Sequence, residues 1–412
     1  MDSSSSGKLR NIIIVYDYAD INGGAAKVAI QSAIALSEMG YKVVFFAASE
    51  PVCEALHRSD VIVKCLGIDD INHGSKIESI TKGVYNKEIE KTFSDFINRF
   101  SVEDTIVHVH GWVKALTSAV IKVSCKKGFK TLITLHDYFT LCPNGGFYNY
   151  KKQEICTKKP MSLSCRICNC DKRNYAQKLW RVSRQIVQDK NVRFNDNITY
   201  ISISQKNEDV VKPFVRSQLF YRVDNPIQLS SSQVEDCSKS NVFLYVGRLS
   251  EEKGIDLFCR AITELKNDYD VQGLVVGNGV LYEHLKKEYP MISFEGWKSS
   301  DEVQKYIQKA RVFVLPSKWY EGAPLSIIEA MSAGIPCIVS DCTSATEIIT
   351  QNKNGFIFTS GSYEKKKKKM MDALDDKLLR NVQTNMKKSF DREKYTEMTH
   401  VSNLIRVYNE TL

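Results

Sequence analysis

The sequence predicts an α/β protein with two doubly wound domains that face a central cleft. At 412 residues the chain exceeds the size that one hydrophobic core normally serves. Strand patterns and helix patterns alternate through both halves, which is typical of parallel sheets covered by helices. Ligands of such sheets bind beyond the carboxyl ends of the strands, so the loops there should carry the functional residues.

The first half begins with a strand at 10–17, a glycine-bearing loop, and a helix at 28–40 whose apolar residues recur at helical spacing. Gly40 suits the end of that helix. The same pattern then recurs, with further strands expected at 41–48, 105–110 and 130–136 and a helix at 86–100. We therefore expect one doubly wound sheet in the first half.

A polar stretch at 225–241 interrupts this pattern, and we interpret it as the linker between the domains. Alternation of strands and helices resumes at Val242. Short strands are expected within 271–279, 291–296, 310–317 and 336–341, and each is followed by a loop. The second half therefore predicts another α/β sheet.

The stretch WYEGAPLSIIEAMSAGIPCIVSD, residues 319–341, places Glu321 and Glu329 on either side of a Gly-Ala-Pro turn. Pro324 suits the first position of a helix that should begin near Ala323 and run to Gly334. At 1.5 Å per residue, Glu329 lies roughly 7–8 Å further along, so the two acids cannot share a proton. Helix N-termini bind phosphate and carboxylates accept hydrogen bonds from hydroxyls. This pattern predicts a site that binds a diphosphate, with a sugar on one side of the diphosphate and a ribose on the other.

A second stretch, VGRLSEEKG at 246–254, supplies the cations that such a diphosphate needs. Arg248 follows a predicted strand, and Lys253 stands at the start of the next helix. The alternative is an ordinary surface arginine and lysine on a loop. The occurrence of both cations together with Glu321 and Glu329 favours the phosphate site.

Taken together, these motifs resemble the retaining glycosyltransferases of the two-domain GT-B type, in the group 4 family that includes bacterial polysaccharide and lipopolysaccharide enzymes. The resemblance spans nearly the whole chain. It rests on NGGA at 22–25, HVHG at 108–111, TLHDY at 134–138, SISQ at 202–205, VDNPI at 223–227, VGRLSEEKG, and EGAPLSIIEAMSAGIPCIVSD with its E-x7-E spacing.

The resemblance implies the domain organisation of that fold. An N-terminal acceptor-side domain would span 1–225, with a cysteine-rich insertion at 139–172. A nucleotide-sugar-binding domain would span 226–390, and a helix at 391–412 would pack back on the N-terminal domain.

The resemblance also implies the roles of the site residues. Arg248 and Lys253 would neutralise the diphosphate of a UDP- or GDP-sugar, Glu321 would contact the transferred sugar, and Glu329 would hold the ribose. The implied donor-binding set is Gly23, Gly24, Gly247, Gly322, Ala323, Leu325, Ser326 and Glu329.

Three residues of the first half complete the implied site. His136 would contact the sugar and act in catalysis, whereas His110 and Asp137 would lie on the acceptor side. His108 and His110 alternate along a predicted strand, so we expect them on opposite faces of it.

Retaining transfer poses a mechanistic problem, because no carboxylate in this sequence is obviously placed as a nucleophile in the manner of a retaining glycosidase. The family resemblance implies departure of the diphosphate and attack of the acceptor hydroxyl on the same face of the sugar. Arg248, Lys253 and the helix N-terminus would stabilise the developing charge. No catalytic metal is then required.

Five of the 12 cysteines fall between 142 and 170. Cys165 and Cys168 have the Cys-x2-Cys spacing of zinc sites, and we predict a structural zinc held by Cys142, Cys156, Cys165 and Cys168. Cys170 is left over in this assignment. Free thiols or a disulfide are the alternatives.

The sequence at 172–194 predicts a helix with an apolar stripe of Tyr175, Leu179, Val182 and Ile186. Lys178, Arg181, Arg184 and Lys190 fall on its other faces. We expect the helix to pack through its apolar stripe. The alternative is peripheral docking to an acidic inner-membrane surface that carries a lipid-linked acceptor.

Composition limits the other functional classes. The net charge of +9 fits an anionic partner, but no aromatic-basic platform or nucleic-acid motif accompanies it. No apolar run reaches the roughly 18 residues of a membrane span, and the N-terminus lacks a signal peptide's apolar segment, so we expect a cytoplasmic location. The first loop lacks the G-x-G-x-x-G of dinucleotide enzymes.

The sequence therefore predicts a transferase that moves a sugar from a nucleotide-sugar to a lipid-linked glycan acceptor in bacterial surface polysaccharide synthesis. The alternative is a non-catalytic protein of the same fold that binds nucleotide-sugars.

Overall fold

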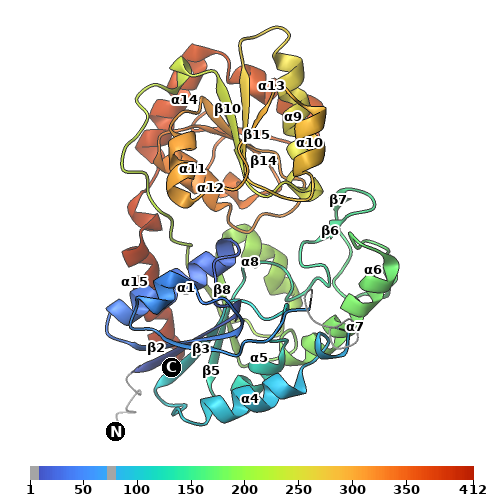
Figure 1. Cartoon of the computed structure of the whole chain (residues 1–412), viewed down its shortest axis with the longest axis vertical. Helices are drawn as coiled ribbons and strands as arrows, with labels where there is room; N and C mark the ends of the chain where they lie inside the picture. The colour runs from blue at the N-terminus through green and yellow to red at the C-terminus, as the bar shows by residue number, and fades with distance from the viewer. Residues whose placement is uncertain (1–8, 72–79) are drawn as a thin grey trace. The chain divides into compact units, whose positions relative to one another are not determined.

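The computed structural model describes residues 9–71 and 80–412 (Figure 1). The chain divides into two compact units. The first unit comprises Met1–Gly146, Thr157–Pro226 and Glu397–Leu412, and the second comprises Phe147–Cys156 and Ile227–Thr396. The domain limits expected from the sequence, at 225/226 and 390/391, stay a proposal.

The first unit contains a parallel sheet of seven strands in the order β3-β2-β1-β4-β5-β8-β9. Its strands are β1 (Asn11–Tyr18), β2 (Lys42–Ser49), β3 (Ile62–Cys65), β4 (Thr105–Val109), β5 (Lys130–Thr134), β8 (Ile198–Ser202) and β9 (Phe220–Arg222). The order reverses between β1 and β4, which makes their carboxyl ends the switch point of this sheet.

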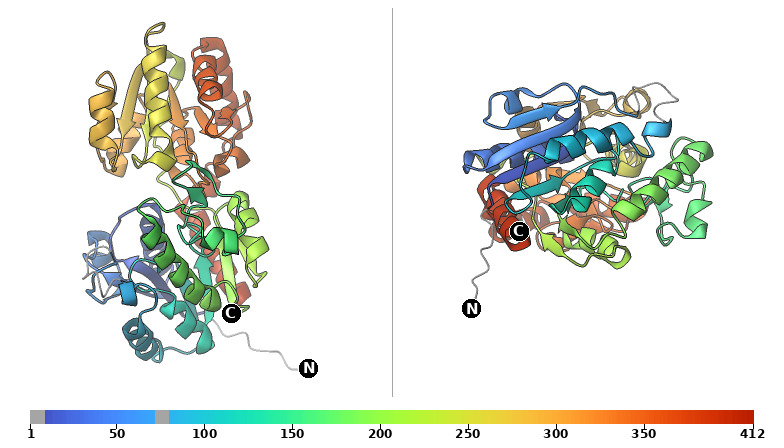
Figure 2. Two further views of the ribbon diagram at one scale, coloured as in Figure 1. Left: turned by 90° about the vertical axis from the view of Figure 1, so that its right-hand side faces the viewer. Right: turned by 90° about the horizontal axis from the view of Figure 1, so that it is seen from below.

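Helices cover both faces of the first sheet, as the two views in Figure 2 show. The helices described in this unit are α1 (Gly24–Glu38), α2 (Glu54–His57), α4 (Lys87–Ile97), α5 (Ala119–Lys126), α6 (Leu163–Arg166), α7 (Tyr175–Asn191), α8 (Gln205–Val211) and α15 (Glu397–Thr411). The C-terminal helix α15 belongs to this unit, as expected, and packs against α1. His400 fixes it, because its ring lies 2.9 Å from Ser32 Oγ and 2.8 Å from the carbonyl oxygen of Asp224.

The second unit contains a parallel sheet of six strands in the order β12-β11-β10-β13-β14-β15. Its strands are β10 (Val242–Val246), β11 (Gln272–Val276), β12 (Ser293–Phe294), β13 (Val312–Leu315), β14 (Cys337–Ser340) and β15 (Phe356–Phe358). Its helices are α9 (Ile255–Leu265), α10 (Tyr282–Glu288), α11 (Ser300–Ile307), α12 (Leu325–Ser332), α13 (Tyr363–Asp372) and α14 (Asp376–Ser389). A short antiparallel hairpin, β6 (Tyr148–Asn149) and β7 (Glu154–Ile155), belongs to this unit.

The α/β prediction with two doubly wound sheets is confirmed, and each strand expected from the sequence is present. Helix α12 differs slightly, because it begins at Leu325 and not near Ala323. Pro324 is its N-cap residue, and the backbone ψ of 93° at Pro324 lies outside the helical region. The residue before a proline is also disfavoured in helical conformation, which explains the later start.

Helix α7 packs differently from the prediction. Its expected apolar stripe is largely exposed, with Tyr175, Leu179 and Ile186 between 39% and 47% accessible to solvent. Its buried side chains are mostly polar or charged: Lys178, Val182, Arg184, Gln185, Gln188 and Asp189. The helix has turned its polar side inward.

The reason for this orientation is the irregular segment after β5, whose carbonyl groups need hydrogen-bond donors. Gln185 donates to the carbonyl oxygen of Thr140 at 3.2 Å, and Gln188 donates to that of Phe139 at 2.6 Å. Trp112 in turn donates its indole N–H to Gln188 Oε1 at 2.9 Å. Helix α7 therefore acts as a polar scaffold for the segment.

We expect Gln188→Leu to destabilise the first unit by about 1–3 kcal/mol, although leucine is more apolar than glutamine. The substitution leaves the Phe139 carbonyl oxygen and the Trp112 indole N–H buried without partners. Urea unfolding followed by circular dichroism measures the change. The matched control is Ile186→Gln on the exposed side of the same helix, which should stay within about 0.5 kcal/mol. A larger loss in the control would mean that the exposed stripe carries the packing.

Candidate functional site

The predicted phosphate-site residues of the second unit follow two neighbouring strands. Arg248 and Lys253 come after β10, and Glu321 comes after β13, which pairs with β10 in parallel. Strand β10 is the first strand of this sheet in the chain. It lies between β11 and β13, so the strand order reverses at β10. These residues therefore occupy the switch point, where doubly wound sheets bind ligands.

Close backbone packing fixes the loops at this switch point. Gly254 has a φ of +67°, and a Cβ added there would lie 2.0 Å from the carbonyl oxygen of Pro316. Gly277, after β11, has a φ of +135°, and its Cβ would lie 2.0 Å from the carbonyl oxygen of Gly247. Only glycine fits either position. The loops after β10, β11 and β13 therefore contact each other directly through their backbones.

Glu321 is the most strongly bound carboxylate of this region. Its Oε1 accepts from Lys253 Nζ at 2.7 Å, from Ser317 Oγ at 2.6 Å and from Trp319 Nε1 at 2.9 Å. Within the residues that the structure describes, all hydrogen bonds donated to this carboxylate go to Oε1. Burial alone would raise the pKa of Glu321, but Lys253 and the two neutral donors hold it below its ordinary value.

Arg248 is anchored on one side and open on the other. Its Nη2 lies 2.8 Å from Glu252 Oε1, which also accepts from Ser250 Oγ at 2.8 Å. The Glu252 side chain is 2% exposed, whereas that of Arg248 is 59% exposed. The guanidinium is therefore held in place while most of its surface stays available to an anion.

Helix α12 provides the remaining predicted donor-site residues. No side chain caps its first turn, so its free backbone N–H groups can donate to a ligand. Gly322, Ala323, Leu325, Ser326 and Glu329 lie in the preceding loop and in the helix, and all are partly exposed. The arrangement can bind a phosphate group.

In the first unit, Gly23 and Gly24 lie at the start of α1, after β1, where both are exposed. No protein atom lies within 4 Å of a Cβ built at Gly23. The fold itself does not need glycine there, which leaves ligand approach as the reason proposed for it.

The histidines after β4 and β5 form one cluster. His110 Nδ1 lies 2.9 Å from His136 Nε2, with their rings stacked. The rings of His108 and His110 are centred 4.1 Å apart, so the expectation that they lie on opposite faces of the strand is wrong. Strand β4 ends at Val109, and His110 therefore no longer follows the alternation of the pleat. His108 is bound by Tyr408 and Thr134, each at 2.7 Å.

Burial keeps these histidines neutral. It lowers the pKa of His136 to about 3 and that of His400 to about 4, and it lowers the pKa values of His108 and His110 well below the ordinary 6.5. A neutral His136 can accept or donate a hydrogen bond but brings no positive charge to a ligand.

Two aspartates lie near the same strand ends. Asp137 keeps a solvent-accessible surface, yet the surrounding protein withdraws it from bulk water and raises its pKa to about 6. Asp17, which the sequence analysis missed, is buried and accepts backbone N–H groups of Lys114, Ala115 and Leu116 at 2.8–2.9 Å. It fixes the loop after β4. Its position at the end of the strand β1 is the feature of the sequence that could have identified it.

The cysteine cluster does not support the predicted zinc. Cys156 belongs to the second unit, whereas Cys142, Cys165 and Cys168 belong to the first. Among residues 9–71 and 80–412, no group of three or more His, Cys, Asp or Glu side chains is arranged to hold a metal ion.

The ammonium of the buried Lys178 lies near three of these thiols. Burial would lower the pKa of Lys178, but the nearby thiols of Cys170, Cys165 and Cys142 raise it above its ordinary value. Cys170, the residue left over in the zinc assignment, also accepts from Asn144 Nδ2 at 3.3 Å. A cationic neighbour disfavours a divalent cation electrostatically, which is the physical reason for the correction.

Comparison with known proteins identifies the second half. The model of the family "Glycosyl transferases group 1" matches residues 229–390. This part of the chain matches the glycosyl transferases group 1 domain. It contains Arg248, Lys253, Glu321 and Glu329, so the group 1 domain and the switch-point site coincide.

Among curated relatives, the Escherichia coli UDP-Gal:alpha-D-GlcNAc-diphosphoundecaprenol alpha-1,3-galactosyltransferase is 32% identical over 156 residues, which are 35% of this chain and 40% of that protein. The chain thus matches less than half the length of this relative. Among the solved structures, the apo form of the lipopolysaccharide outer core galactosyltransferase WaaB has a TM-score of 0.62 at 19% identity, over 98% of this chain and 100% of that one. Anabaena Alr3699/HepE, solved with UDP and glucose, has a TM-score of 0.63 at 14% identity, over 97% and 100%. These likenesses establish the GT-B fold for both units around the group 1 domain.

We expect Lys253→Met or Glu321→Gln to destabilise the second unit by about 3–5 kcal/mol, because each leaves a buried polar group without its main partner. The double variant should lose less than the sum of the two. The control is Glu264→Gln, which breaks the 2.8 Å pair with Lys367 at a more exposed position and should cost about 1 kcal/mol or less. Denaturant unfolding of the four variants decides this, and additive losses would contradict a direct coupling.

The histidine cluster predicts an acid-sensitive first unit. Below pH 6.5 the unfolded chain protonates histidines that the folded unit keeps neutral, so stability falls as the pH drops from 6.5 toward 4. Each buried histidine contributes up to about 1.4 kcal/mol per pH unit. Asp137, Asp17, Asp189 and Glu397 act in the opposite direction, since their raised pKa values favour folding at low pH. The histidine contribution is therefore clearest between pH 7.5 and 6, because Asp137 titrates only at about 6.

Unfolding in urea at pH 7.5, 6 and 5 measures this dependence. The second unit is a suitable internal reference, because the one histidine in its sequence range is the exposed His284. His110→Asn should reduce the slope for the first unit. Equal free energies of unfolding at pH 7.5 and 6 would show that the histidines titrate normally.

Proposed function

We propose that this protein is a retaining glycosyltransferase that transfers a sugar from a UDP- or GDP-sugar to a lipid-linked glycan acceptor in bacterial surface polysaccharide synthesis. The observation that carries the proposal is the Lys253–Glu321 pair beside Arg248, at the switch point of the group 1 domain. The solved complex of Anabaena HepE with UDP and glucose supports a nucleotide-sugar as the donor.

The donor's diphosphate is proposed to lie between the open face of Arg248, Lys253 and the uncapped N-terminus of α12. These groups supply two cations and several N–H donors. Glu321 Oε2 is then directed to a hydroxyl of the transferred sugar, because the donors among the described residues all bind Oε1. Glu329 is proposed to accept the ribose hydroxyls from the second turn of α12.

The state of Glu321 supports same-face transfer. The ammonium and the two neutral donors on Oε1 lower the pKa of Glu321, and a less basic carboxylate is a weaker nucleophile at its free Oε2. We therefore assign to it a binding role. The bond between the sugar carbon and the diphosphate oxygen breaks, the acceptor oxygen forms the new bond on the same face, and its proton passes to the departing diphosphate.

Charge on that diphosphate is stabilised by Arg248 and Lys253, so the proposal requires no catalytic metal. His136 is proposed to contact the sugar as a neutral hydrogen-bonding group, and His110 and Asp137 are proposed for the acceptor side. The lipid-linked acceptor is supported by the E. coli relative, whose name contains a diphosphoundecaprenol acceptor.

Peripheral docking to an acidic membrane is part of the proposal. Within the described residues, no helix has the length and apolarity needed to cross a bilayer.

We expect Arg248→Ala to lower the transfer rate by about 100-fold or more, through loss of roughly 3 kcal/mol of transition-state stabilisation. Arg260→Ala is the matched control, because Arg260 is also an exposed arginine paired with a glutamate four residues later in the same domain. Release of nucleoside diphosphate from a panel of UDP- and GDP-sugars provides the assay. Equal rates in both variants would remove Arg248 from the site.

The same assay separates the enzyme from the alternative, a non-catalytic nucleotide-sugar-binding protein. Such a protein would bind UDP but release no nucleoside diphosphate from any sugar nucleotide, with or without acceptor. Adding EDTA tests the metal-free mechanism, which predicts an unchanged rate. Loss of activity that is restored by magnesium or manganese would contradict it.

A further inference from the structure

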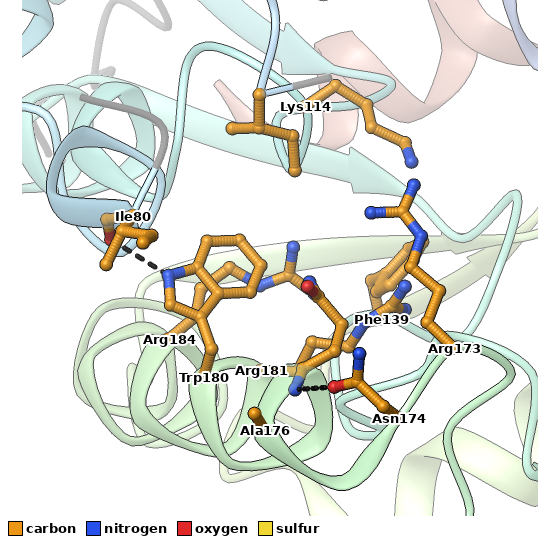
Figure 3. A pocket seen from close by; sticks show the side chains of 11 residues that line it. Ile80, Lys114, Phe139, Arg173, Asn174, Ala176, Trp180, Arg181 and Arg184 are labelled. Atoms are coloured by element: carbon orange, nitrogen blue, oxygen red, sulfur yellow. Dashed lines mark hydrogen bonds between the residues drawn. The ribbon is translucent and has the colours of Figure 1, made fainter. Parts of the chain in front are cut away.

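A basic pocket of about 360 Å³ lies in the first unit, and none of the residues assigned above lines it (Figure 3). The loops after β4 and β5 and one side of α7 form its walls. Four of its lining side chains are cationic, namely Lys114, Arg173, Arg181 and Arg184, and two are aromatic, namely Phe139 and Trp180. Figure 3 shows the side chains of Lys114 and Arg173 directed toward the same space.

The base of this pocket is held in place by hydrogen bonds from the buried Arg184. Arg184 is only 4% exposed, and its terminal nitrogens donate to the carbonyl oxygens of Val113 and Pro143 at 3.3 and 3.1 Å. Its guanidinium lies 5.2 Å from the ring centre of Phe139 and 5.4 Å from that of Trp180. The Nε of Arg184 is buried and has no partner among the described residues.

Trp180 is fixed as well, because its indole N–H donates to the carbonyl oxygen of Ile80 at 2.8 Å (Figure 3). A fixed aromatic ring beside several cations is a suitable surface for a sugar ring or an apolar chain attached to an anion. The pocket therefore offers both a charged part and an apolar part.

One of these cations, Arg181, is paired with an acid, because Asp171 lies 3.0 Å from its Nε. Asp17 accepts three backbone N–H groups, and Asp70 accepts from the Tyr18 hydroxyl. Asp137 interacts with Lys114 and Arg184 only at a distance.

The cations consequently repel each other. Burial together with Arg181 lowers the pKa of Arg184 to about 10, and burial together with Arg181 and Arg184 lowers the pKa of Lys114. Bringing an anion into the pocket would relieve this repulsion.

We propose that this pocket binds the diphosphate ester group of the lipid-linked acceptor, an inference that rests on the proposed function. A diphosphate carries enough charge to satisfy several cations at once, whereas a neutral sugar does not. The exposed apolar side chains Tyr175 and Leu179 lie on α7, next in sequence to residues that line the pocket, and they suit the lipid part of the same ligand.

The test uses the full chain and three probes in isothermal titration calorimetry: inorganic diphosphate, geranyl diphosphate and UDP. The variant is Lys114→Gln/Arg173→Gln, which removes two of the cations that line the pocket. The matched control is Lys172→Gln/Lys190→Gln, which removes the same charge from exposed positions that do not line the pocket. Thermal unfolding verifies that both double variants are folded.

We expect the pocket variant to bind geranyl diphosphate at least about 10-fold more weakly than the wild type, and the control to change less than about 2-fold. UDP binding, assigned to the second unit, should not change in either variant. Saturating UDP should leave the geranyl diphosphate affinity of the wild type intact.

Equal weakening in both double variants would overturn the pocket assignment, since it would reflect net charge alone. Equal affinity for inorganic and geranyl diphosphate would keep the diphosphate site but overturn the lipid-linked source. Competition by UDP would assign the anion site to the donor. The proposed function is tested separately. It fails if the wild type turns over no sugar nucleotide, and diphosphate binding to the pocket can still be measured in that case.

Discussion

The arrangement of the second unit's site depends on one buried ion pair, between Lys253 and Glu321. The two residues are 68 positions apart in the sequence and follow different strands, so the pair ties the loop after β10 to the loop after β13. Ser317 and Trp319 add two donors to the same oxygen, which offsets the cost of removing the carboxylate from water. A buried charge held by three donors cannot leave its place cheaply. The positions of Arg248 and of the start of α12 are fixed relative to each other by the same loops.

In the first unit, too, side-chain hydrogen-bond donors hold an irregular segment in place. Its long segment after β5 has little regular structure, and its carbonyl groups would be costly to bury without donors. Helix α7 supplies these donors from glutamine and arginine side chains, and as a consequence Tyr175, Leu179 and Ile186 face solvent. The apolar surface near the basic pocket is thus a result of how the segment is supported. This origin links the local fold to the acceptor site that we propose.

The fold could be predicted from the sequence because continuous apolar runs ending in loops indicate buried parallel strands without further information. Glu321, Lys253 and Arg248 could be located because they follow such strands. Their pairing could not be predicted, because a contact between residues 253 and 321 depends on which strands are neighbours in the sheet. The roles assigned to these residues stay predictions.

The errors have equally specific causes. The apolar stripe of α7 was expected to face the core because amphipathic patterns usually do, but the unpaired carbonyl groups of a neighbouring segment decided the orientation instead. The zinc prediction relied on cysteine spacing, which contains no information about the lysine that lies among the thiols or about Cys156 joining the other unit. His108 and His110 were assigned to opposite faces because strand alternation was extended one residue past the end of β4.

The two proposed ligands are both anions, and each proposed site offers cations to attract them. A donor diphosphate would meet Arg248 in the second unit, and an acceptor diphosphate would meet Lys114 and the arginines of α7 in the first. Arg248 and Lys253 are each paired with a carboxylate as well, so the protein and the donor would share these cations. The deeply held cations, Lys253 and Arg184, are bound by protein groups and fix the geometry, while the accessible ones contribute most of the salt-sensitive attraction. High ionic strength should therefore weaken binding of both ligands before it affects the stability of either unit.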